Sequence, residues 1–193
     1  MKSLSHRAWL FVTLLLLHYT PSQASRVQGV SLEEMTQRAD RIFSGRCVSV
    51  RMATDPDLGQ MVTYVTFAPS RVEKGNIRGS VTIKVLGEQD ADAPRGRVTQ
   101  GLPRFRKGEE VVLFLYGDSR QGLTSPVGFG QGKFTVLKDK AGHPLAFNEV
   151  GNENLFHGLS GNAQKKLNPA IEKLQGKGLS PNSLLDLVHS LVN

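Results

Sequence analysis

Cysteine, histidine and serine are the residue types that could supply a nucleophile and a base in this chain. Cys47 is the only cysteine, and His143, His157 and His189 lie far from it in the sequence. A catalytic thiol needs an adjacent base, and a hydrolase serine needs a G-x-S-x-G turn. The GLSG segment at 158–161 lacks that spacing. The sequence therefore predicts no catalytic residue.

Metal and phosphate sites are not indicated either. No two of those histidines have a short ligand spacing, and a second cysteine is absent from the sequence. The GFGQGK segment at 128–133 resembles a phosphate loop, but Val127 stands where its first glycine belongs and Phe134 stands where Ser or Thr would bind magnesium. We expect these glycines to allow close backbone approach or a bulge before a strand. We therefore expect no cofactor and no metal.

The main candidate for binding is a basic cluster in a long loop. Residues 87–108 contain glycine, proline and charge without a sustained period, and connections of this length often carry function. The cluster follows the acidic residues Glu88, Asp90 and Asp92. It forms either a solvated loop with internal ion pairs or a surface for a protein or an anionic envelope component. The candidate contact residues are Arg95, Arg97, Arg104, Phe105, Arg106 and Lys107.

The distribution of aromatic residues argues against nucleic acid as the partner. The only tryptophan is Trp9, and beyond residue 24 the only tyrosines are Tyr64 and Tyr116, which fall in expected strands. Proteins that bind single strands stack the bases on exposed aromatic rings. We therefore expect a protein or anionic envelope partner instead.

The first 24 residues have the pattern of a secretory signal peptide. Lys2 and Arg7 precede the apolar run 8–17, and the small residues Ser22 and Ala24 provide a cleavage site. The run is shorter than the ~20 residues that span a bilayer. We predict cleavage after Ala24, export to the periplasm or beyond the cell, and no transmembrane segment afterwards. The alternative is an uncleaved N-terminal anchor.

Cleavage would leave 169 of the 193 residues and lower the formal net charge from +7 to +5. Hydrophobic residues at 39% and charged residues at 21% are ordinary for a globular protein, which excludes global disorder. A lone cysteine cannot form an intramolecular disulfide. Cys47 is either buried as a small apolar side chain, which its strand context favours, or available for pairing between chains.

Periodicity predicts a β-rich domain over residues 25–150. Ser31 and Glu34 form a capping box before a helix at 32–39. The run EVVLFLY at 110–116 is typical of a central strand buried on both faces. Alternating or β-branched patterns predict further strands at 41–52, 60–72, 80–86 and 132–138, with a short edge strand at 144–148.

Residues 151–193 are expected to form a helical segment after a loop at 151–161. A weak helix at 162–175 is interrupted by Pro169. A stronger helix at 180–192 has Ser180 as N-cap and Pro181 at the first helical position. Its apolar residues recur on one face, which we expect to pack on the β structure: Leu184, Leu187, Val188 and Leu191.

Five strands in this order suggest a small Greek-key barrel of the OB type with flanking helices. The chain resembles a group of uncharacterised bacterial exported proteins. The matching motifs are SLEEM at 31–35, ADRIFSGR at 39–46, VEKG at 72–75, FRKGEEVVLFL at 105–115 and GQGKF at 130–134. This resemblance implies an OB-like barrel similar to the inhibitory domain of tissue inhibitors of metalloproteinases, and it implies no activity. In those inhibitors an N-terminal cysteine chelates the catalytic zinc, whereas the expected N-terminus here is Ser25.

Our leading hypothesis is a non-enzymatic exported module that binds a partner through the loop 87–108. One alternative is an inhibitor-like protein that acts on an envelope or secreted protease, which a panel of such proteases would test. Another is an enzyme whose site is assembled from residues scattered along the sequence. A pocket containing several titratable groups with perturbed pKa values would favour the enzyme.

Overall fold

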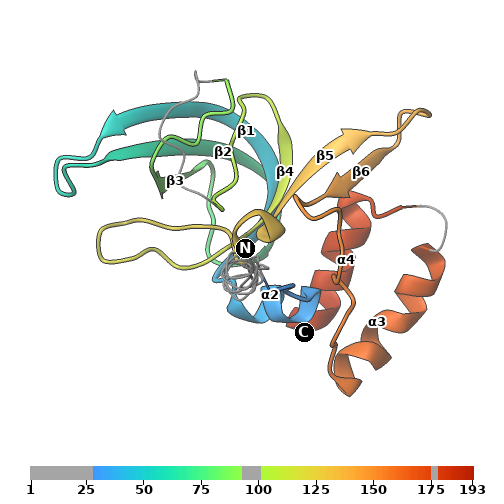
Figure 1. The fold of residues 1–193 in the computed structure, drawn as a ribbon. Coiled ribbons are helices and arrows are strands. Elements are labelled where there is room, and N and C mark those ends of the chain that lie inside the picture. The colour runs from blue at the N-terminus through green and yellow to red at the C-terminus, as the bar shows by residue number, and fades with distance from the viewer. Residues whose placement is uncertain (1–27, 93–100, 175–177) are drawn as a thin grey trace, which may run out of the picture.

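The computed structural model describes residues 28–92, 101–174 and 178–193. Its centre is a six-stranded sheet in the order β3-β2-β1-β4-β5-β6, in which every neighbouring pair is antiparallel (Figure 1). The predicted signal peptide, Arg95 and Arg97 lie outside the described residues. The strands are β1 Arg41–Thr54, β2 Met61–Lys74, β3 Val81–Leu86, β4 Glu110–Leu115, β5 Lys133–Lys138 and β6 Pro144–Phe147.

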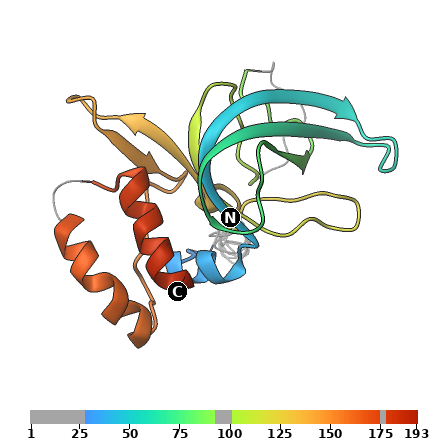
Figure 2. The ribbon, with the colours of Figure 1, turned by 180° about the vertical axis from the view of Figure 1, so that it is seen from behind.

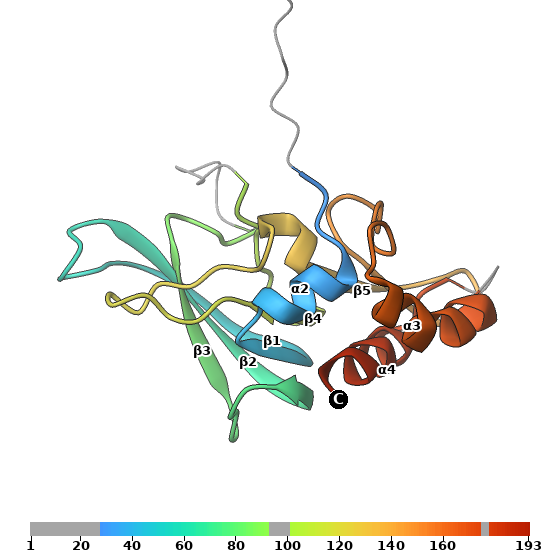
Figure 3. The same ribbon diagram turned by 90° about the horizontal axis from the view of Figure 1, so that it is seen from below.

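Three α-helices accompany the sheet in the described part of the chain. They are α2 (Leu32–Arg38), α3 (Gly161–Leu174) and α4 (Pro181–Val192), and a 3-10 turn, η1 (Phe129–Gly132), precedes β5. Helix α4 packs against α2, β2 and β6. Figure 2 shows α4 beneath the β5–β6 hairpin, and Figure 3 shows α3 beside α4.

The predicted helix starts are confirmed. The Ser31 side chain accepts a hydrogen bond from the Glu34 N–H at 3.2 Å, which caps α2. The Ser180 side chain accepts one from the Ser183 N–H at 3.0 Å, and Pro181 begins α4. Each cap satisfies an N–H group that the first turn of a helix leaves without a partner.

The sheet separates two apolar clusters, as the predicted burial of β4 on both faces requires. On the helix-side face, Val112 and Phe114 pack with residues of α2 and α4. On the opposite face, which we call the inner face, Val111, Leu113 and Leu115 pack with residues of β1, β2 and β3. Side chains alternate across a strand, so a strand buried on both sides lies at the centre of the fold.

Three expectations need correction. The structure is mainly β with flanking helices, but the sheet has six strands and is not closed into a barrel, because β3 and β6 remain its two ends. Helix α3 continues through Pro169. Leu167 before the proline and Ile171 after it both pack into the helix-side cluster, and this packing offsets the hydrogen bond that proline cannot donate. The glycine-rich segment before β5 forms the turn η1 rather than a strand bulge.

The glycines of this segment do permit close backbone approach. A Cβ atom on Gly132 would lie 2.4 Å from the Val127 carbonyl oxygen. Phe129, in the same turn, has a φ of 58°, in the left-handed region. This turn brings Lys133, the first residue of β5, under the loop that precedes β4, where a candidate binding surface lies.

Candidate binding surface

Phe105 is not an exposed contact residue, so that part of the predicted site is wrong. Its side chain has 0% exposure and belongs to the inner-face cluster. Its ring packs edge-on against Phe67, with 5.7 Å between the ring centroids. An aromatic ring gains far more by filling this cluster than by remaining in water. Phe105 therefore anchors the loop and leaves its charged neighbours to face solvent.

Backbone hydrogen bonds hold both described ends of this loop. The Phe105 N–H donates to the Gln89 carbonyl at 2.7 Å, and the Ala91 N–H donates to the Phe105 carbonyl at 2.9 Å. Near β4, the Gly108 N–H donates to the Cys47 carbonyl at 2.7 Å, and the Cys47 N–H donates to the Glu109 carbonyl at 2.9 Å. The segment 105–109 thus has a fixed backbone conformation on the sheet.

A buried ion pair adds a side-chain clamp. Lys133 Nζ lies 3.0 Å from the Glu109 carboxylate, and the two side chains are only 7% and 12% exposed. The same Nζ donates to the Arg104 carbonyl at 2.5 Å and lies 4.9 Å from the centre of the Phe105 ring. The Glu109 carboxylate also accepts from the Arg106 N–H at 3.0 Å. This Lys133–Glu109 clamp therefore fixes the positions of residues 104–106.

The described basic residues differ in their surroundings. Arg106 Nε donates a hydrogen bond to the Asp92 carboxylate at 2.8 Å on the surface, and this bond raises the pKa of Arg106. This pair is the internal ion pairing that one sequence interpretation expected. Arg104 is half-buried and Lys107 is exposed, and neither forms an ion pair with another described residue. Among the described residues, the clamped loop therefore carries two positive charges without an ion-pair partner.

Cys47 lies against this clamp without forming a reactive site. Its side chain is fully buried, and burial, followed by the Glu109 carboxylate, raises the pKa of the thiol to about 11. The Sγ donates to the Ser49 carbonyl at 3.7 Å. A protonated thiol is a weak nucleophile, and a buried one cannot reach another chain. The prediction that Cys47 is buried is confirmed, and a disulfide between folded chains is excluded.

The histidines lie elsewhere. His143 pairs with Asp139 at 3.2 Å in the β5–β6 turn, and His189 on α4 contacts Glu73 at 3.0 Å. His157 lies in the turns before α3. Within residues 28–92, 101–174 and 178–193, no three His, Cys, Asp or Glu side chains gather as a metal site would require.

Sequence reasoning missed Lys133 and Glu109 as parts of this surface. The only signal in the sequence was that Lys133 precedes Phe134 at the start of a strand whose side chains alternate between its two faces. This alternation puts the lysine on a face that packs against other residues. The sequence alone did not identify Glu109, 24 residues earlier, as its partner.

Comparison with known proteins does not assign the chain to a family. No protein-family model matches it, and a search of curated proteins finds no match. Among the described helices, none combines the length and apolar character needed to cross a bilayer. The functional conclusion therefore depends on the geometry of the clamped loop.

Proposed function

We propose that this chain is a non-enzymatic exported interaction module that binds a protein or an anionic envelope component through its basic loop. The observation that carries the proposal is the Lys133–Glu109 clamp, which fixes the loop backbone, while Arg104 and Lys107 form no ion pair with another residue that the structure describes. A preorganised charged surface loses little conformational entropy when it binds. An exposed rim of one charge also increases the rate of association with a partner of opposite charge.

Two observations favour binding over catalysis. The thiol of Cys47 has a raised pKa and is buried. The buried Lys133 and Glu109 are engaged with each other and with loop backbone groups rather than with an open cavity. Buried charges that are fully hydrogen-bonded are more typical of a structural clamp than of an acid–base pair awaiting a substrate.

We further propose that the inner face is an incomplete OB-like barrel. The strand order β3-β2-β1-β4-β5 is the order expected for such a barrel. An isolated parallel bridge joins Lys84 of β3 to Leu123, and the Thr124 N–H donates to the Lys84 carbonyl at 2.9 Å. Tyr116, which follows β4, donates its N–H to the Ser125 carbonyl at 3.1 Å. The segment 123–125 would thus bridge the edge strand β3 to the residue that follows β4.

An in-cell crosslink and pull-down of the mature protein tests the proposed function. Washing at low and at high salt, followed by mass spectrometry, separates a specific protein partner from anions held by charge alone, because salt screens exposed charges. We expect Lys107→Glu to reduce the recovered partner. Arg120→Glu is the matched control, since Arg120 is an exposed arginine in a different loop. Equal recovery with wild type and Lys107→Glu would contradict the proposal.

A further inference from the structure

A groove of about 590 Å³ crosses the helix-side face of the sheet. Its floor follows a row of neighbours on adjacent strands. Ala68 of β2 pairs with Arg46 of β1, and Arg46 pairs with Glu110 of β4. The pairing of Val111 with Thr135 brings Val136 of β5 next to Glu110.

The groove exists because α4 covers only part of this face. Ile42 and Phe114 lie beneath the helices in the helix-side cluster, but the helix begins at Pro181 and does not extend over the row of Arg46 and Glu110. Pro181 and Asn182 therefore form one wall of the groove rather than its cover.

The chemistry of the groove is mixed. Ser44 and Ser70 line it, and their hydroxyl oxygens lie 2.9 Å apart, exposed on the floor. The Arg46 side chain is 58% exposed, and its guanidinium donates to the Glu110 carboxylate and, at 3.3 Å, to the Gly108 carbonyl. The floor thus offers hydroxyl groups, small apolar side chains and an arginine whose position is fixed by two acceptors.

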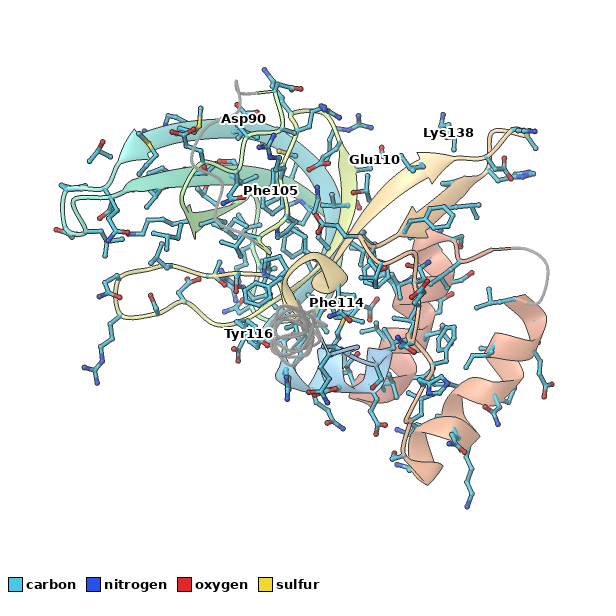
Figure 4. The ribbon with its side chains drawn as sticks, viewed as in Figure 1. Asp90, Phe105, Glu110, Phe114, Tyr116 and Lys138 are labelled. Atoms are coloured by element: carbon cyan, nitrogen blue, oxygen red, sulfur yellow. The ribbon has the colours of Figure 1, made fainter. Side chains whose placement is uncertain are left out.

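The charges at the edge of the groove are predominantly positive. Lys138 pairs across strands with Pro144, which lines the groove, and Lys107 adjoins Gly108, whose carbonyl accepts a hydrogen bond from Arg46. Neither lysine forms an ion pair with another described residue. The nearby carboxylates are already engaged: Glu110 by Arg46, and Asp139 by backbone N–H groups of its own turn. Figure 4 shows Glu110 where β4 begins and Lys138 where the neighbouring β5 ends.

We propose that this groove binds an extended acidic peptide segment of a partner protein. Its row spans four strands, about 14 Å at the usual spacing of about 4.8 Å, which about four extended residues would match at about 3.4 Å each. A carboxylate of the segment pairs with Arg46, and Glu110 turns to solvent. The serine hydroxyls donate hydrogen bonds to the segment, and Lys138 and Lys107 attract its remaining charge. This inference deepens the proposed function and rests on it.

Fluorescence anisotropy with two labelled peptide pools tests this assignment. One pool contains hexapeptides of Asp, Glu, Ala, Val and Ser, and the other replaces Asp and Glu by Asn and Gln. We expect the mature protein to bind the acidic pool, and Arg46→Glu to weaken that binding by about tenfold or more. Ala68→Trp, which fills an exposed position of the floor, weakens it as well. Arg120→Glu, the charge-matched control outside the groove, leaves it unchanged.

Glu110→Gln distinguishes the groove from a general charge effect. Removing the carboxylate that competes for Arg46 should tighten binding of the acidic pool. Circular dichroism confirms that each variant is folded. The assignment is overturned if wild type binds neither pool, if it binds both pools equally, or if Arg120→Glu weakens binding as much as Arg46→Glu. If the cellular partner is lost with Lys107→Glu but retained with Arg46→Glu, the groove proposal is contradicted. The proposal that the basic loop binds the partner is then still supported.

Discussion

Lys133→Met removes the cation of the clamp and leaves Glu109 with a buried, unpaired carboxylate. It also leaves the Arg104 carbonyl without its donor. Removing one partner of a buried ion pair typically costs about 3–5 kcal/mol. We expect a loss of about 3 kcal/mol in the free energy of unfolding, at the lower end of that range, because Lys133 and Glu109 keep 7% and 12% exposure.

Urea unfolding followed by far-UV circular dichroism measures this loss, since the only tryptophan, Trp9, lies in the predicted signal peptide. Lys138→Met is the matched control: an exposed lysine of the same strand, whose replacement should change stability by less than about 0.5 kcal/mol. The double variant Lys133→Met/Glu109→Gln should recover part of the loss, because no buried charge remains unpaired. A loss below about 1 kcal/mol for Lys133→Met would refute the clamp. Additive effects of the Lys133 and Glu109 substitutions in a double-mutant cycle would refute it as well.

Three further predictions concern other parts of the fold. Cys47 should react with a thiol reagent only after unfolding, because it is buried and its pKa is raised to about 11; rapid labelling of the native protein would contradict this. The hydrogen bond from Lys84 lowers the pKa of Asp55, so its stabilisation is present at neutral pH and is lost as pH falls below about 4. The decrease in melting temperature between pH 7 and pH 3 should therefore be smaller for Asp55→Asn than for wild type. Equal decreases would contradict this role of Asp55. Gln131 accepts from the Val30 N–H at 2.8 Å and donates to the Gln28 carbonyl at 3.0 Å. Gln131→Ala should cost about 2 kcal/mol in urea unfolding and speed hydrogen exchange at Val30, whereas unchanged exchange would show that Gln131 does not hold this segment.

Local signals predicted most of the strands and helices. The unbroken apolar run before Tyr116 predicted a central strand, and β4 is buried on both faces. Ser180 followed by Pro181 predicted where α4 begins. These features depend on residues within a few positions of one another, which a pattern in the sequence records directly.

Contacts between distant residues could not be predicted in the same way. Phe105 stands between Arg104 and Arg106, so the sequence placed it on a charged surface, yet it packs with Phe67 on the inner face. Pro169 predicted a helix break, but burial of residues on both sides of it maintains α3. In both cases tertiary packing outweighs the local preference.

The candidate surface shows the same difference between local signals and contacts of distant residues. Its basic residues were visible as a cluster, while the clamp that positions them joins two residues from different strands and loops, Lys133 and Glu109. The groove beside Arg46 depends on the position at which α4 starts relative to the sheet. Sequence patterns do not specify such packing geometry.

The most direct test of the proposed contact surface is site-specific photo-crosslinking in the cells that produce the protein. A photoreactive amino acid replaces either Lys107 in the basic loop or Arg120 in the loop before β5, both of which are exposed. We expect a defined adduct from position 107 and none from position 120. Adducts of equal yield from both positions, or none from position 107, would contradict the claim that the clamped basic loop is the contact surface.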